Sequence, residues 1–189
     1  MSQAPVATPP TAEDVPSLRQ LIQLVREDRN ANLKEWTYPG FQALLAYRLG
    51  RFRRGIRSPF ARRLVSVLHR HLAKRAVRRY GIELHDTAIV GRRVRIIHQN
   101  GITVHAGAVI GDDCWIRQGA QVGSRAATGE AGPVLGQDVR LGVNVSIPNR
   151  VIVGDGARLG PNCVVCGDLP EGSSTMPPRQ RKVRQQSPE

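Results

Sequence analysis

The feature that most constrains this chain is a six-residue period between residues 84 and 165. An aliphatic residue recurs at every sixth position, with two interruptions, and a small or β-branched residue commonly follows four places later. The aliphatic positions are Leu84, Val90, Ile96, Ile102, Ile110, Ile116, Val122, Leu135, Leu141, Ile147, Val153, Leu159 and Val165. This period matches neither the 3.6 residues of a helical turn nor the alternation of a strand. A short repeat that buries its apolar face only against neighbouring repeats predicts a parallel β-helix of the hexapeptide type.

The repeat divides the chain into regions. We expect a disordered N-terminus at residues 1–10, an α-helical region at 11–81, the β-helix at 82–170 and a flexible tail at 171–189. A loop at 123–134 is expected to interrupt the β-helix, because the aliphatic period fails there and the composition is that of a loop. A solenoid of about four coils is long enough to bury a continuous core.

Three helices are expected in the region at 11–81. The first has a candidate N-cap at Thr11, the second begins near Pro39 and breaks at Gly55, and the third runs from Ser58 to a stop at Gly81. The apolar stripe of the third helix is Phe60, Leu64, Val65, Leu68, Leu72, Ala76 and Tyr80. This stripe is expected to pack on the other helices, on the first coil or on another subunit.

The positive charge is concentrated in one segment. The net charge is +13, and residues 43–82 contain twelve Lys and Arg and no Asp or Glu. Such a segment attracts an anionic partner, which could be a membrane surface, an acidic polymer, a phosphate-rich cofactor or nucleic acid, or it forms a solvated helix face. Nucleic acid ranks low, because few aromatic residues lie among the arginines.

The expected location is cytoplasmic, with peripheral attachment to a membrane left open. The chain has an odd number of cysteines, three, and no apolar secretion signal at its N-terminus. No apolar run approaches the roughly 18 residues of a membrane span. Cys163 and Cys166 form a CxxC, but two further ligands for zinc are missing nearby, so we expect core cysteines and no metal.

The two interruptions of the period indicate where function lies, because solenoids carry functional residues on insertions. The eight-residue spacing from Ile102 to Ile110 predicts a two-residue bulge around His105. The other interruption is the loop at 123–134, between Val122 and Leu135.

His98 is the candidate general base. It lies between an aliphatic pair and the turn Gln99-Asn100-Gly101, and histidine is the usual base near neutral pH. Glu83 precedes it by fifteen residues, close to one coil, so a carboxylate could orient the imidazole from the adjacent coil. The alternatives are a structural turn histidine and a surface carboxylate.

Three segments resemble the serine O-acetyltransferases of the hexapeptide-repeat acyltransferase superfamily. They are Pro39-Gly-Phe-Gln-Ala-Leu44 with Tyr47-Arg48, Tyr80-Gly-Ile-Glu-Leu-His85, and the hexads from His98 to Gly123. The resemblance covers about residues 15–170. It is strongest to the compact members of exopolysaccharide and other biosynthetic clusters.

The resemblance implies a left-handed parallel β-helix that assembles as a homotrimer or a dimer of trimers, with active sites between subunits. It implies direct acetyl transfer from acetyl-CoA to the hydroxyl of serine or a serine-like metabolite. His98 stands at the place of the family's base, Glu83 at the place of its Asp partner, and Asp28 at the place of a residue that contacts the acceptor.

The resemblance also implies where CoA lies. The oxyanion would be held by backbone N–H groups near Gly123 and Ser124, and the cofactor would run along the coils by Gly142 and Val145.

The sequence departs from the family at the acceptor. Ile97 replaces an Asp before the base, and Ala131-Gly132 replaces an Arg-His pair that contacts the substrate carboxylate, a role for which Arg125 is a candidate replacement. The family's Gly-Val-Pro-Ala near the C-terminus is replaced by Met176-Pro-Pro-Arg179. A sugar hydroxyl in polysaccharide biosynthesis is therefore an alternative acceptor, and a non-catalytic trimeric scaffold that binds anionic partners is a second alternative.

Overall fold

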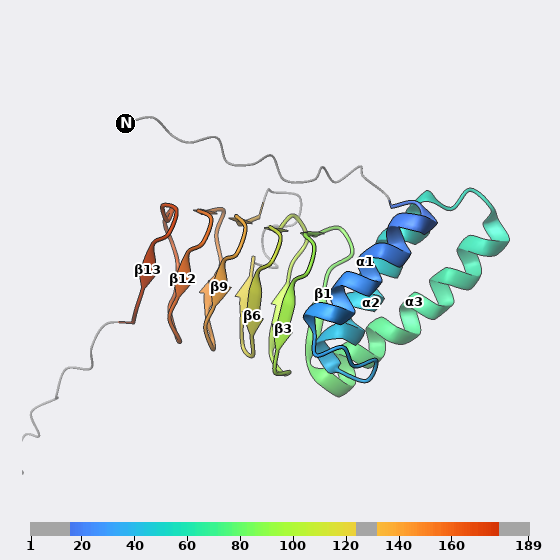
Figure 1. Ribbon diagram of the computed structural model, residues 1–189, viewed down its shortest axis with the longest axis horizontal. Helices are drawn as coiled ribbons and strands as arrows, with labels where there is room; N and C mark the ends of the chain where they lie inside the picture. Colours follow the sequence, from blue (N-terminus) through green and yellow to red (C-terminus); the bar gives the residue numbers. More distant parts are fainter. Residues whose placement is uncertain (1–15, 124–131, 178–189) are drawn as a thin grey trace, which may run out of the picture.

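The computed structural model describes residues 16–123 and 132–177, and it confirms a helical region followed by a parallel β-solenoid. Figure 1 shows the three helices gathered at one end of the solenoid, against its first coil. The segment expected to be disordered at 1–10 lies outside the described residues.

The helical region contains α1 (Leu18–Ala31), α2 (Pro39–Phe52), a 3-10 turn (Arg53–Gly55) and α3 (Pro59–Tyr80). The predicted ends of α3 are confirmed, since Ser58 caps its N-terminus and Gly81 ends it in a left-handed conformation. The first helix begins later than expected. Its N-cap is Ser17, which forms a capping box with Gln20, whereas Thr11 lies outside the described residues.

The solenoid consists of three parallel sheets, and each coil contributes one strand to each sheet. The first sheet contains β1 (Ile82–Leu84), β4 (Ile102–Val104), β7 (Gln121–Val122) and β10 (Ser146–Ile147). The second contains β2 (Ile89–Val90), β5 (Val109–Ile110), β8 (Val134–Leu135) and β11 (Ile152–Val153). The third contains β3 (Arg95–Ile97), β6 (Trp115–Arg117), β9 (Arg140–Leu141), β12 (Arg158–Leu159) and β13 (Ser174–Thr175). β13 lies beyond the predicted end of the β-helix at residue 170.

The aliphatic positions of the period stack inside the prism. Ile96, Ile110, Leu135 and Ile147 are fully buried, and they belong to one continuous core. Backbones of successive coils approach closely at the turns, where a Cβ on Gly111 would lie 2.4 Å from the carbonyl oxygen of Gly136.

The two extra residues lie at His98 and not around His105. Val104 pairs with Val122, and the six-residue spacing from Val104 to Ile110 is unbroken. The expansion falls between Ile96 and Val104, in the turn that joins β3 to β4. The prediction was wrong because Ile102 and Val104 both point into the core from β4, so Ile102 was mistaken for the periodic position.

The expected packing of the α3 stripe holds only at its C-terminal end. Ala76 and Tyr80 are buried, whereas Phe60, Leu64 and Leu68 are exposed. α2 and the first coil cover only one side of α3. Among the described residues, no helix is long and apolar enough to cross a membrane.

Candidate active site

His98 lies in the expanded turn, in a backbone conformation that side chains rarely adopt. Its φ is 62°, and Asn100 and Gly101 follow with φ values of 85° and 70°. The corresponding turn of each later coil has a single left-handed residue: Gly119, Asn144 or Asn162. Left-handed residues other than Gly are uncommon, and strained backbone gathers at functional sites. The side chain of His98 is exposed, so a substrate can reach it.

The end of α3 and the next coil hold this turn in place. The Asn100 N–H donates to the carbonyl of Tyr80 over 2.8 Å, and the Ile102 N–H donates to that of Gly81. On the other side, the Gly119 N–H donates to the carbonyl of Asn100 over 2.8 Å. The backbone around His98 is therefore bonded to the coil or helix on both sides, which fixes the direction of its side chain.

Glu83 lies on the adjacent coil, but it does not bond to His98 within one chain. The first coil is longer than three six-residue repeats, since Ile82 pairs with Ile102 and Glu83 pairs with Thr103. His98 lies in the turn that leads into this pairing. In the described part of the chain, no hydrogen bond or ion pair joins the Glu83 carboxylate to His98, so its orienting role stays a prediction.

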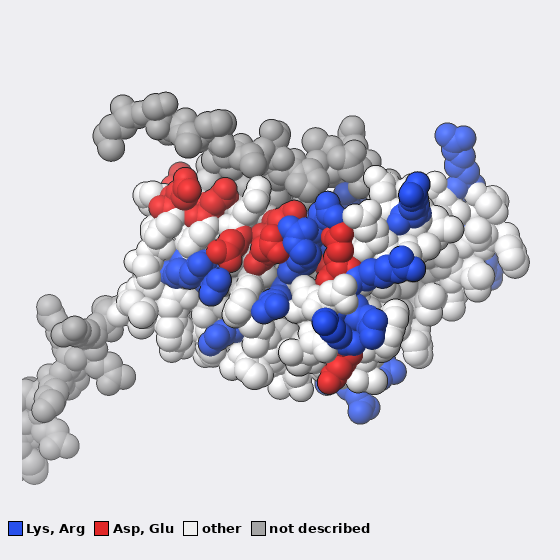
Figure 2. Space-filling view, viewed as in Figure 1, with Lys and Arg blue, Asp and Glu red and all other residues white. Residues whose placement is uncertain are grey.

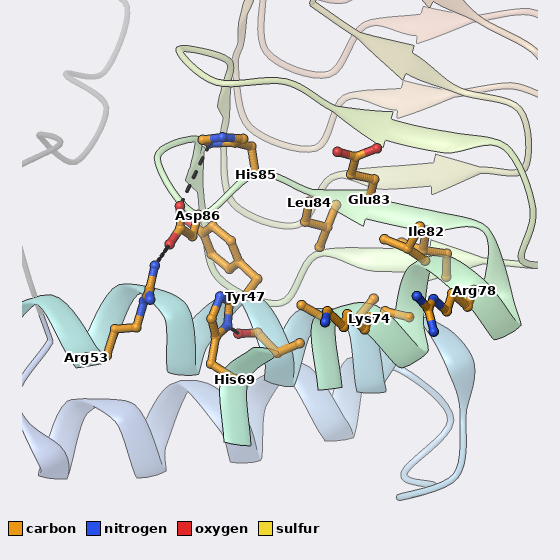
Figure 3. A pocket seen from close by; sticks show the side chains of 15 residues that line it. Tyr47, Arg53, His69, Lys74, Arg78, Ile82, Glu83, Leu84, His85 and Asp86 are labelled. Atoms are coloured by element: carbon orange, nitrogen blue, oxygen red, sulfur yellow. Dashed lines mark hydrogen bonds and ion pairs between the residues drawn. The ribbon is translucent and has the colours of Figure 1, made fainter. Parts of the chain in front are cut away.

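Glu83 lines a cavity of about 400 Å³ between α2, α3 and β1. In Figure 3 the Glu83 carboxylate lies on the side of β1 that faces away from α3, the helix that carries His69 and Lys74. The other carboxylate of the wall, Asp86, is held by Arg53 at 2.6 Å and by Arg54 at 3.1 Å.

These ion pairs set the ionisation of Asp86. Burial acts to raise its pKa, but the hydrogen bond from Arg53 and the charges of Arg54 and Arg53 outweigh burial, and the pKa lies below its usual value. Of the two carboxylates that line the cavity, only Glu83 has no hydrogen bond or ion pair to another described residue.

Asp28, the predicted acceptor contact, is 1% exposed and is held by Arg48. The Arg48 Nε donates to Oδ2 over 2.8 Å and a terminal nitrogen donates to Oδ1, while the same guanidinium donates to the carbonyls of Val90 and Gly91. Asp28 thus fastens α1 and α2 to the first coil. This placement does not support contact with a substrate, and that role stays a prediction.

The described residues that were predicted to contact CoA are each used within the solenoid itself. The Gly123 N–H donates to the carbonyl of Ile147 over 2.9 Å, so it is already used within the solenoid. A Cβ on Gly142 would lie 2.7 Å from the carbonyl oxygen of Leu159, which explains the glycine by coil stacking. Val145 is fully buried, so its side chain is not available to CoA.

Ser124 and Arg125 lie outside the described residues. Within residues 16–123 and 132–177, no group of three or more His, Cys, Asp and Glu is placed to hold a metal ion.

Two of the three cysteines are buried, and the third is exposed. Burial raises the pKa of the Cys114 thiol to about 12, so it is protonated near neutral pH. Cys163 is buried as expected, but Cys166 is exposed, and the three are free thiols. Of the CxxC, Cys163 therefore belongs to the core and Cys166 to the surface.

Gln118 is a polar residue near the site that the sequence patterns did not single out. It follows Arg117, which pairs with Ile97, so it lies on the coil next to His98. Its side-chain oxygen is buried and has no hydrogen-bond partner among the described residues. The only sequence signal for Gln118 was a polar side chain before the turn at Gly119. Polar residues are common in turns, so this signal did not distinguish it.

Comparison of this sequence with known proteins identifies its family. Residues 132–167 match the family model described as bacterial transferase hexapeptide (six repeats). A serine acetyltransferase of Helicobacter pylori (strain J99 / ATCC 700824) is 34% identical over 168 residues, which are 86% of this chain and 94% of that protein.

A second relative, from Escherichia coli (strain K12), carries the name colanic acid biosynthesis acetyltransferase WcaB and is 29% identical over 78% of this chain and 91% of its own length. A solved serine acetyltransferase in complex with CoA superimposes with a TM-score of 0.66 at 23% identity, over 83% of this chain and 67% of that one, which shows the shared fold. The extent and identity of the Helicobacter match place this chain in the serine acetyltransferase family of hexapeptide-repeat acyltransferases.

Proposed function

We propose that this chain transfers an acetyl group from acetyl-CoA to a hydroxyl acceptor, with His98 as the general base. The observation that carries the proposal is the exposed His98 in a left-handed turn that the expansion of the first coil creates. The CoA in the solved relative supports the donor. An exposed imidazole on a rigid turn is suited to meet a substrate that neighbouring groups enclose.

In the proposed reaction, neutral His98 removes the proton of the acceptor hydroxyl while the oxygen attacks the thioester carbonyl of acetyl-CoA. The new ester C–O bond forms, the C–S bond breaks, and the proton passes from His98 to the departing CoA sulfur. Glu83 would orient the imidazole and stabilise its protonated form. Cys114 is buried and protonated, so it is not available as a nucleophile for an acyl-enzyme intermediate.

The site is proposed to be completed by a second copy of the chain. His98 is exposed in one chain, and the Gly123 N–H is already bonded to Ile147, so another group would have to stabilise the oxyanion. A trimer with sites between subunits, as the family resemblance implies, would supply groups from a neighbouring copy.

Serine or a serine-like metabolite is the first candidate acceptor, supported by the name of the Helicobacter relative. A sugar hydroxyl is the second, and two observations favour it: Ala131-Gly132 stands where the family has an Arg-His pair, and the Escherichia coli relative is named for colanic acid biosynthesis. A carboxylate whose partners are removed binds substantially worse, whereas a sugar hydroxyl needs no cation.

Release of CoA thiol from acetyl-CoA, measured over a panel of amino acid and sugar acceptors, tests the proposal and separates the two acceptors. Turnover with at least one hydroxyl compound supports acetyl transfer. Calorimetry with CoA separates the enzyme from the scaffold: absence of binding at high micromolar CoA, together with absence of turnover, would establish a non-catalytic scaffold.

A further inference from the structure

The outer side of α3 exposes a row of large apolar side chains. Phe60 is 81% exposed and Leu64 is 64% exposed, and Val67 and Leu68 are about half exposed. These residues are spaced by four, three and one, so they fall on one stripe of the helix. Isolated exposed apolar residues are ordinary, but a contiguous stripe on one helix indicates an interaction surface.

The opposite side of α3 is the one that packs on the protein. Ala76 and Tyr80 are buried, and the His69 Nδ1 lies 2.9 Å from the carbonyl oxygen of Ala46 in α2. Figure 1 shows the N-terminal part of α3 projecting from the helical end of the molecule, far from β13. The apolar stripe therefore faces outward from the end of the molecule.

Positive charge surrounds and continues this stripe. The Lys and Arg residues of α3 are Arg62, Arg63, Arg70, Lys74, Arg75, Arg78 and Arg79. In the described structure none of them forms an ion pair, and residues 43–82 contain no acidic side chain that could pair with them locally. On the face that Figure 2 shows, no acidic side chain lies at the projecting end of the helical region.

The C-terminal half of the outer side forms a basic hollow. His71, Lys74, Arg75, Arg78 and Arg79 line a shallow cavity of about 450 Å³. The outer side of α3 thus has an apolar half near residue 60 and a cationic half near residue 75.

Charge decides between the partners that could cover this face. A second copy that packed the same face against it would bring two sets of arginines together, and like charges at an interface are unfavourable. Nucleic acid would satisfy the arginines but would leave the aliphatic row exposed. A bilayer with anionic headgroups satisfies both halves, because its acyl boundary takes apolar side chains and its surface attracts Lys and Arg.

We propose that the outer face of α3, formed by Phe60, Leu64, Val67 and Leu68 with the surrounding arginines, binds the surface of a membrane that contains anionic phospholipids. The helix lies in the plane of the interface and does not cross the bilayer. This binding does not depend on acetyl transfer, since it uses neither His98 nor Glu83.

Flotation of the full chain with lipid vesicles tests this proposal. Wild type is expected to float with vesicles of phosphatidylcholine and phosphatidylglycerol, and not with vesicles of phosphatidylcholine alone. The R63E/R70E variant is expected to bind about tenfold more weakly or worse, because each charge near an anionic surface contributes substantially. F60S/L64S is expected to lose a similar factor through its apolar contacts.

R19E/R26E is the matched control. Arg19 and Arg26 are exposed on α1 with the same seven-residue spacing, so this variant changes the net charge equally without touching α3. It is expected to bind nearly as wild type does. The substituted residues are exposed, so circular dichroism should show unchanged folding in the three variants.

Several results would overturn the proposal. One is failure of wild type to float with phosphatidylglycerol vesicles, and another is an equal loss of binding in R19E/R26E and R63E/R70E. Unchanged flotation of F60S/L64S would also overturn it, since the apolar row would then play no part. If light scattering shows that F60S/L64S breaks up an assembly while wild type does not float, the face is an interface between copies of the chain.

Discussion

The Arg48 guanidinium binds the Asp28 carboxylate through two hydrogen bonds, and both side chains are almost completely buried. The same guanidinium also bonds to the carbonyl oxygens of Val90 and Gly91 in the first coil. One buried ion pair thereby connects α1, α2 and the β-helix. Such a pair is costly to break, because the remaining charge is left buried without a partner.

Asp28→Ala is expected to lower the free energy of unfolding by about 3 to 5 kcal/mol, because Arg48 is left uncompensated. Urea unfolding measures this change. Glu27→Ala is the matched control, since the neighbouring Glu27 pairs with Arg92 at the exposed surface and such pairs contribute at most about 1 kcal/mol. Equal losses in the two variants would show that Asp28 does not hold the helices on the coil.

The pairing of Asp86 with Arg53 and Arg54 predicts a pH dependence of stability. The pKa of Asp86 is lowered in the folded protein, so the carboxylate stabilises the fold above its unfolded pKa of about 3.9. This contribution is lost as the pH falls through the lower folded pKa. Asp86→Asn is expected to cost about 1 to 2 kcal/mol at neutral pH.

The unfolding free energies of wild type and Asp86→Asn should therefore converge below about pH 4. A difference that stays constant down to about pH 2 would argue against the ion pair as its cause.

The close stacking of turns predicts that Gly111→Ala is destabilising. The added Cβ would lie 2.4 Å from the carbonyl oxygen of Gly136, which is backbone and cannot move aside, so a loss of about 1 to 3 kcal/mol is expected. Gly167→Ala provides the comparison, because nothing lies within 4 Å of its Cβ and its φ is not left-handed. It should be neutral or stabilising by up to about 1 kcal/mol. Thermal unfolding of the two variants checks the difference, and a neutral Gly111→Ala would contradict the tight coil spacing.

The regular part of the fold was predictable because every six-residue repeat must bury an aliphatic side chain inside the prism. An inward aliphatic residue every six positions defines the coils, and the Ser58-Pro59 and Gly81 signals gave the ends of α3. The position of the expansion was not predictable from the period alone. Ile102 and Val104 are both aliphatic and both buried in β4, so the pattern could be followed through either residue.

The candidate site was predictable only in part. His98 could be found because it lies between an aliphatic pair and a polar turn, but the contacts of Asp28 could not be found. The family resemblance implied that Asp28 contacts the acceptor, whereas Arg48, twenty residues later, pairs with its carboxylate in the interior. The exposure of Phe60 and Leu64 likewise depends on how far α2 covers α3, and the periodicity of one helix does not contain that information.

The most direct test of the account is the rate of CoA release by the His98→Ala variant with an accepted hydroxyl compound. His71→Ala is the control, because His71 is an exposed histidine on α3, away from the expanded turn. We expect kcat to fall by about 100- to 10,000-fold in His98→Ala, with unchanged circular dichroism and with His71→Ala close to wild type. Wild-type turnover in His98→Ala would contradict the assignment of His98 as the base.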